Sequence, residues 1–267
     1  MKKFFYVFYV ALILLFIYAP IFTLVLYSFV DTPVVSIEQA FKIGFSFDLY
    51  KKLFNDAALM KIVWDTLLLA GIVAVLSTLL GTAGAIGIYY SKGKLGKGIA
   101  TANQIPVINA EIVTAVALVL LFALVIKESR SYVILVVGHL IITTPFVVLS
   151  VLPKLKQMDP NMYEAALDLG ASPFKALIKV VLPEIFPGIL SGFMLAITLS
   201  LDDYIISAYT KPAGFDTIST YVYGAMAKAN ANSSLPALRA LSAIIFVVII
   251  LVVIGKNIYA TRKEKQR

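Results

Sequence analysis

Long apolar runs separated by short polar segments dominate the chain. A helix needs about 20 mostly apolar residues to cross the hydrocarbon core of a membrane, and six segments meet this requirement. They cover about residues 4–30, 62–90, 98–126, 131–152, 184–210 and 235–259. The pattern predicts an all-α integral membrane protein with six transmembrane helices, which together form a single transmembrane domain over residues 1–267.

The basic residues predict how these helices are oriented. Lys and Arg are enriched in cytoplasmic segments of membrane proteins. With the N-terminus placed inside, most of the 23 Lys and Arg residues fall on the inner side, and the outer segments carry most of the loop acids. The first apolar run, Phe4–Val30, is far longer than the apolar region of about 7–15 residues in a signal peptide, so we expect an uncleaved span. Both termini are therefore predicted to be cytoplasmic, in a multi-pass protein of a prokaryotic inner or plasma membrane.

The amino-acid composition agrees with a membrane protein and limits the side chains that could carry out catalysis or bind a metal. The chain is 60% hydrophobic and 14% charged, against about 45–50% and about 25% in soluble domains. The net charge of +8 lies mostly beside apolar runs, so it indicates topology and not a nucleic-acid partner. Without cysteine, and with His139 as the single histidine, the chain has few groups for a membrane enzyme. We expect no catalytic residue, metal or cofactor in this chain, and we expect His139 to hydrogen-bond between helices.

The loop between the fourth and fifth spans, residues 153–183, carries clear helix start and stop signals. Asp159 precedes Pro160 and Ser172 precedes Pro173, which is the pattern of an N-cap followed by proline in the first turn. Gly170 suits the left-handed position that ends a helix. The expected helices cover Pro160–Leu169 and Pro173–Val181, and Leu182-Pro183 is expected to close the second.

Both expected loop helices carry an apolar stripe at helical spacing. The stripes are Met162, Ala165, Ala166 and Leu169 in the first helix, and Phe174, Leu177, Ile178 and Val181 in the second. Isolated helices of this length are marginal in water, so another surface must pack on them. That surface is either the protein's own bundle or a cytoplasmic partner, and the residues alone leave both interpretations open.

The spacing within this loop resembles a known signature. Glu164-Ala165-Ala166, Gly170, Val180 and Leu182-Pro183 match the E-A-A loop of permease subunits of ABC-type importers, with Val180 where Ile is usual. In that family the loop sits in a groove of a separate ATPase subunit and couples ATP-driven closure to the spans. The resemblance assigns ATPase coupling to Glu164, Ala165, Ala166, Asp168, Gly170, Leu182 and Pro183.

Three carboxylates fall inside predicted spans: Glu111 in the third, and Asp202 and Asp203 in the fifth. A charge near the centre of a membrane helix costs about 2.5–3.5 kcal/mol on insertion scales, so each needs a cavity or a partner. Consecutive helix positions differ by about 100°, so one Asp can face a pathway while the other caps or pairs. The alternative is that an Asp bonds to a neighbouring span and Glu111 bonds to Asn103 or Gln104.

Over about residues 1–260, the chain resembles one permease subunit of spermidine/putrescine importers. The matching stretches are T-P-F-V-V at 144–148, L-S-L-D-D at 199–203 and N-A-E-I-V at 109–113, where the family often has Pro-Asp-Ile-Val. This resemblance implies a substrate pathway at Asp202, Asp203, Glu111 and Tyr204, with carboxylates pairing with the ammonium groups of a polyamine and Tyr204 adding a cation–π contact.

The resemblance also implies an assembly. It comprises a second homologous permease, which would form a heterodimer with this chain, two cytoplasmic ATPase subunits and an extracytoplasmic substrate-binding protein. The chain has no G-x-x-x-x-G-K-[ST] pattern, so ATP and Mg²⁺ are expected on the ATPase subunits. The alternative function is an importer of the same type for a phosphonate, a metal ion or an oxyanion. A passive channel would leave the capped loop unexplained. Outside the spans, residues 217–228 are expected to form a short amphipathic helix.

Overall fold

The computed structural model describes residues 2–30, 45–91, 93–128, 130–228, 239–244, 246, 247 and 250, and all elements in these ranges are helical. The chain divides into two compact units, one of residues 1–61 and 222–267 and the other of residues 62–221. The units are described separately below. One domain over the whole chain stays a prediction.

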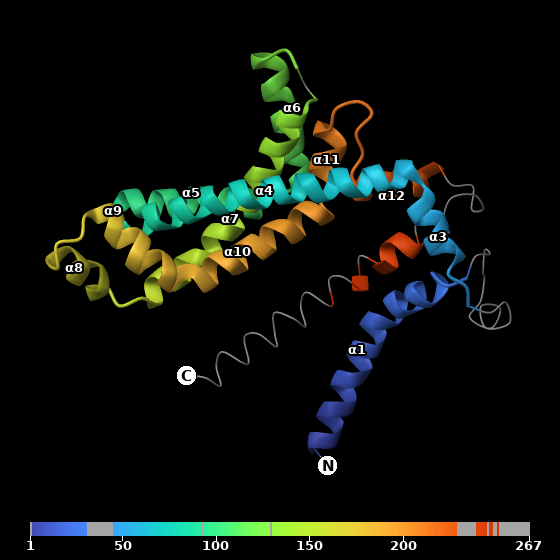
Figure 1. The fold of residues 1–267 in the computed structure, drawn as a ribbon, viewed down its shortest axis with the longest axis horizontal. Helices are drawn as coiled ribbons and strands as arrows, with labels where there is room; N and C mark the ends of the chain where they lie inside the picture. The colour runs from blue at the N-terminus through green and yellow to red at the C-terminus, as the bar shows by residue number, and fades with distance from the viewer. Residues whose placement is uncertain are drawn as a thin grey trace. The chain divides into compact units, whose positions relative to one another are not determined.

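Hydropathy predicted most of the spans in the described ranges. Four helical segments are long and apolar enough to cross a membrane: Tyr6–Tyr27, Ala57–Tyr90, Tyr132–Gln157 and Pro173–Asp202 (Figure 1). They correspond to the first, second, fourth and fifth predicted spans. The sixth predicted span, 235–259, lies mostly outside the described residues. The count of six spans and the orientation of the termini therefore stay predictions.

The first unit contains α1 (Lys2–Tyr27) and α3 (Asp48–Asn55). No residue of the apolar segment of α1 is buried, and residues 6–20 are all exposed, as expected for a helix whose surroundings are lipid. The end of α1 is tied to α3 by the hydroxyl groups of Ser28 and Tyr50, which lie 2.6 Å apart. The ring of Phe29 packs against that of Tyr50, with 5.3 Å between the ring centroids.

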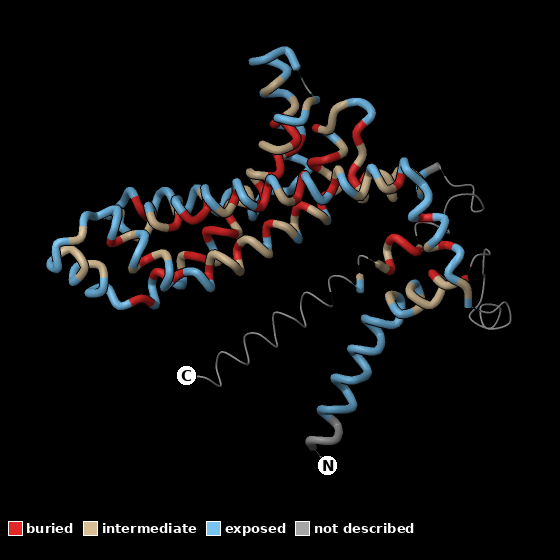
Figure 2. The backbone as a smooth tube through the Cα atoms, viewed as in Figure 1, coloured by how far each residue is buried: buried red, intermediate tan, exposed pale blue. Residues whose placement is uncertain are grey.

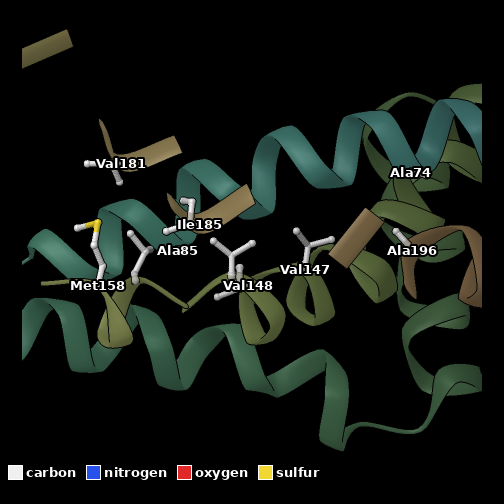
Figure 3. Close-up of a cluster of buried hydrophobic side chains, with 10 residues drawn as sticks. Ala74, Ala85, Val147, Val148, Met158, Val181, Ile185 and Ala196 are labelled. Atoms are coloured by element: carbon white, nitrogen blue, oxygen red, sulfur yellow. The ribbon is translucent and has the colours of Figure 1, made fainter. Parts of the chain in front are cut away.

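The second unit is built on three helices: α4 (Ala57–Tyr90, from residue 62 onward), α7 (Tyr132–Gln157) and α10 (Leu182–Asp202). Buried residues gather where these helices face one another (Figure 2). Their side chains form one apolar core, which includes Ala74, Ala85, Val147, Val148, Met158, Val181, Ile185 and Ala196 (Figure 3).

Small residues let the three helices approach closely around Val147. A Cβ atom added at Gly81 of α4 would lie 2.6 Å from Val147 Cβ, and one at Gly192 of α10 would lie 3.0 Å from Val147 Cγ1. Apolar surface gains nothing by leaving lipid, so membrane helices associate through such close packing. Val147 therefore fills the space that two glycines leave open on either side of α7.

The third predicted span, about residues 98–126 with interruptions expected at Asn103, Gln104 and Pro106, is bent in the structure, and its count as one span stays a prediction. The segment forms α5 (Lys94–Ile108) and α6 (Glu111–Val125), which meet at an angle of 104° (Figure 1). Asn109 and Ala110 between them are extended, with ψ angles of 145° and 132°. The amide Nδ2 of Asn109 donates to Thr114 Oγ1 at 3.0 Å, and this bond holds the turn into α6.

The connection between the fourth and fifth spans also differs in part from its prediction. α7 continues to Gln157, and α8 (Asn161–Asp168) follows the predicted first loop helix closely. α9 (Pro173–Ala176), however, runs through a π-helical turn, Leu177–Val181, directly into α10. Leu182-Pro183 therefore opens the spanning helix α10, with the proline in its first turn, but the helical backbone continues into it without a break. A proline ring clashes with the carbonyl four residues before it, and the wider π turn, with Leu182 N bonded to Leu177 O, accommodates that ring.

Two shorter helices complete the described part of the chain. α11 (Ile205–Thr210) follows α10 after a break, and α12 (Ile218–Lys228) confirms the helix expected over residues 217–228.

Candidate functional site

α8 is capped at both ends by the residues that the sequence indicated. At its start, Asp159 Oδ1 accepts a hydrogen bond from Asn161 N at 2.9 Å. At its end, Gly170 has φ +84° and its N–H donates to Leu167 O at 2.9 Å, while Ala171 N–H donates to Ala166 O at 3.0 Å. This pair of bonds is a Schellman motif, which a residue with positive φ makes possible. α8 is therefore a preformed element and not a flexible connector.

The apolar stripe of α8 is largely uncovered, whereas the second stripe is divided: Leu177 and Val181 pack into the apolar core, and Phe174 and Ile178 are exposed. No residue of α8 is buried. Leu169 is 89% exposed and Phe174 is 70% exposed, and Met162 and Ile178 are also exposed. Large apolar side chains at this exposure on a loop between spans indicate a surface that another protein can cover. Both interpretations left open by the sequence therefore apply in part: Leu177 and Val181 pack on the protein's own bundle, and the exposed residues of the two stripes are free to meet another protein.

The seven residues expected to couple to an ATPase fall into two groups. Glu164, Ala165, Asp168 and Gly170 are exposed and Ala166 is half-buried, all on or just after α8. Leu182 packs against the apolar core, and Pro183 follows it in the first turn of α10. The first group can touch a partner, whereas the second lies where the loop joins the span.

A second group of polar residues surrounds the break between α10 and α11 (Ile205–Thr210). The carboxylate of Asp203 caps α11: Oδ1 accepts from Ile206 N at 3.2 Å and Oδ2 accepts from Ser207 N at 2.8 Å. The side chain is 1% exposed. The fifth span is thus interrupted at Asp203, and the interruption is stabilised by that residue's own carboxylate.

His139 of α7 joins this cap from the neighbouring helix. Its Nδ1 lies 2.9 Å from Leu135 O, and because a carbonyl only accepts, Nδ1 carries the proton and donates. Its Nε2 lies 3.4 Å from Ser207 Oγ and 3.5 Å from Asp203 Oδ2. The predicted role of His139, a hydrogen bond between helices, is confirmed.

The two adjacent aspartates have different surroundings. Asp203 is buried and its carboxylate oxygens are occupied by the cap, whereas Asp202 is exposed. Asp203 is therefore placed as a structural cap, whereas Asp202 is exposed. Tyr204 stands at the N-cap position of α11 and is half-buried.

Glu111 is the first residue of α6. It is exposed in the first turn of this helix, where the helix dipole stabilises a negative charge. The expected alternative partner, Asn103, has its Nδ2 directed at Pro145 O, 3.5 Å away. The sequence did not predict that Glu111 follows a helix break. Asn109, a residue that favours turns, three positions after Pro106, was the available signal.

α6 and α11 pack together close to their starts. Ala115 of α6, Ile142 of α7 and Ile206 of α11 form a buried cluster. Gly138 of α7 makes room for Ile206, whose Cγ2 would lie 2.5 Å from a Cβ added at the glycine. Interrupted membrane helices whose N-terminal ends approach one another are a common way to build a solute site at membrane depth.

Comparison with known proteins agrees with this arrangement. Residues 131–262 match the family described as binding-protein-dependent transport system inner membrane component. The putrescine transport system permease protein PotI of Escherichia coli K12 is 31% identical over 258 residues, covering 94% of this chain and 89% of PotI. The spermidine/putrescine permease PotC of the same strain is 30% identical over 222 residues, covering 83% of this chain and 82% of PotC.

Solved structures share the fold. A bacterial ABC transporter that imports the acidic polysaccharide alginate matches with a TM-score of 0.68 at 18% identity, over 98% of this chain and 96% of the other. The MetNI methionine ABC transporter in an inward-facing conformation matches with a TM-score of 0.61 at 18% identity, over 76% and 95%.

Proposed function

Since the chain belongs to the family of binding-protein-dependent transport system inner membrane components and is a permease of an ABC importer, we propose that its cargo is a polyamine such as putrescine or spermidine. The observation that carries this proposal is a pair of exposed carboxylates beside two helix breaks: Glu111 is the first residue of α6, and Asp202 is the last residue of α10. The sequence has no Lys or Arg between residues 98 and 126 or between residues 180 and 210. Acidic groups without neighbouring basic ones favour a cationic solute.

The chemistry of a polyamine suits these groups. Two spaced ammonium groups can each pair with a carboxylate, and Tyr204 offers an aromatic face near Asp202 for a cation–π contact. Residues 98–126 and 180–210 are otherwise almost entirely apolar or neutral, so the ion pairs would form where little water screens them. That Escherichia coli PotI and PotC bear the names of polyamine permeases supports this assignment.

We further propose that α8 is the docking element for a cytoplasmic ATPase subunit. Its exposed apolar residues and its preformed caps support this role. In this proposal the ATPase subunits bind ATP and Mg²⁺, a second, homologous permease completes the pathway, and an extracytoplasmic binding protein delivers the solute. The cell membrane would be a prokaryotic inner membrane. Closure of the ATPase subunits would move α8 and shift the spans between inward-open and outward-open states.

Uptake of labelled putrescine and spermidine by the assembled transporter in proteoliposomes tests the cargo. Asp202→Asn and Glu111→Gln should each reduce uptake about tenfold or more, because a charge-assisted bond contributes about 1.5–3 kcal/mol. Glu128→Gln is the control, since Glu128 is an exposed acid away from both helix breaks. Unchanged polyamine uptake in both variants would contradict the proposal, and assays with a phosphonate, a metal ion and an oxyanion would then identify the cargo.

A further inference from the structure

A group of tyrosine rings lies between α8 and the end of α4. The ring centroids of Tyr163 in α8 and Tyr90 in α4 are 5.3 Å apart, with the rings tilted by 49°. Tyr90 also packs edge-on against Tyr89, at 5.0 Å between centroids. These distances are those of favourable aromatic contacts. The group joins a loop helix to a spanning helix that is distant from it in sequence.

Tyr163 is also the side chain of α8 that packs against the apolar core. Among the residues of α8, all of which the structure describes, Tyr163 packs against the apolar core that α4, α7 and α10 share. α8 also contacts α9 and the π turn, which follow it directly in the chain. The contact made by Tyr163 thus adds a direct link between α8 and α4.

α8 itself has the features of a rigid lever. It is capped by Asp159 at one end and by the Schellman motif at Gly170 at the other. Its outer side is exposed and its inner side rests on Tyr163. A displacement of the exposed side of α8 is therefore transmitted through the contact between Tyr163 and Tyr90 as well as through the backbone on either side of α8.

We propose that Tyr163 is a positioning residue that transmits movement of α8 to α4 through Tyr90. This inference rests on the proposed function, in which an ATPase subunit moves α8. An aromatic ring has few rotatable bonds and packs over a large area, so it passes on a displacement that a flexible side chain would absorb. Tyr163 precedes Glu164 and lies outside the residues that the E-A-A signature specifies.

The test is the amount of putrescine imported per ATP hydrolysed by the assembled transporter. Tyr163→Ala should lower this ratio about fivefold or more, a typical size for coupling between sites, while the ATPase subunit still co-purifies. Tyr163→Phe is the matched control, because it keeps the ring, and its ratio should stay close to that of the wild type. An unchanged ratio in Tyr163→Ala would overturn the inference, and so would loss of the ATPase subunit, which would show a role in docking.

Tyr90→Ala tests the same contact from the spanning helix, so the inference does not depend on one variant folding. If the two rings act as one link, the double variant should be no worse than either single variant. Independent, multiplying effects would overturn the inference.

A distance measurement tests the link without reference to cargo. The chain has no cysteine, so spin labels can be placed at Asn161→Cys on α8 and Leu80→Cys on α4. The distance between them should stay constant through the ATP cycle in the wild type and change in Tyr163→Ala. An equal change in both proteins would overturn the inference.

Leu169→Glu separates this inference from the proposed function. If Leu169→Glu releases the ATPase subunit while Tyr163→Ala leaves both the ratio and the label distance unaltered, docking stands and the role of Tyr163 fails. If Leu169→Glu leaves the ATPase subunit bound and transport normal, the docking proposal fails as well.

Discussion

Nε2 of His139 lies 3.5 Å from Oδ2 of Asp203, and the two side chains are 0% and 1% exposed. With its proton on Nδ1, the imidazole can accept a hydrogen bond from Ser207 Oγ, 3.4 Å from Nε2, and this bond ties the middle of α7 to the point where the fifth span is interrupted. Two backbone N–H groups at the start of α11, those of Ile206 and Ser207, depend on the same carboxylate. A buried polar group left without its partner costs about 1–3 kcal/mol, so the cluster is a structural requirement for the break.

Asp203→Ala should therefore destabilise the protein. It removes the cap of α11 and leaves two buried N–H groups unsatisfied, and we expect a loss of about 2 kcal/mol in the free energy of unfolding. Unfolding of the purified protein in mixed micelles measures this loss. Asp202→Ala is the control, because Asp202 is exposed, and it should change stability by less than about 0.5 kcal/mol. Equal destabilisation by the two variants would contradict the assignment of Asp203 as the cap.

These two aspartates also show what the sequence could and could not predict. Adjacent positions indicated that their roles differ, but not which one turns inward, because that depends on His139, which lies 64 residues earlier in the chain. The ends of α8 were predictable because Asp159 and Gly170 act on backbone groups a few residues away. The break at Asn109 was missed because apolar residues flank it on both sides, and hydropathy does not register a bend.

The close approach of α4 to α7 gives a prediction on packing. Gly81→Ala should destabilise the protein by about 1–3 kcal/mol, because its methyl group would lie 2.6 Å from Val147 Cβ and force the helices apart. Gly71→Ala is the matched control on the same helix, since nothing lies within 4 Å of a Cβ added there. Thermal unfolding of the two variants in detergent makes the comparison.

A compensating change sharpens this test. Val147→Ala in the Gly81→Ala background should recover part of the lost stability, because it removes Cγ1, which would lie 2.7 Å from the added Cβ, although Val147 Cβ itself remains. A double variant that is as unstable as the sum of the two single variants would show that the contact is not the cause.

Gly170 gives a prediction that concerns backbone conformation alone. Its φ is +84° and nothing lies within 4 Å of an added Cβ, so Gly170→Ala should cost about 1–2 kcal/mol through strain and not through a clash. Because α8 is exposed, we expect the strain to unwind the end of this helix while the membrane spans stay folded. Uptake should fall at unchanged levels of inserted protein. Gly170→Asn is the control: Asn tolerates positive φ better, so uptake in Gly170→Asn should exceed that in Gly170→Ala.

The exposed side of α8 gives the last prediction. Ala165 is exposed and lies inside a helix, where Glu is a favourable residue, so Ala165→Glu should leave the folding and insertion of this chain unchanged. It places a bulky charge on the surface proposed to meet the ATPase subunit, where an unpaired charge would have to be desolvated. We expect co-purification of the ATPase subunit to fall about tenfold or more, with loss of uptake, for a penalty above about 1.4 kcal/mol.

Gln157→Glu makes the same change in charge at the exposed end of α7, where Lys154 Nζ already donates to the side-chain oxygen at 3.1 Å. This control should assemble and transport normally. Equal loss of the ATPase subunit in both variants would attribute the effect to net charge, whereas a loss confined to Ala165→Glu would locate the docking surface on α8.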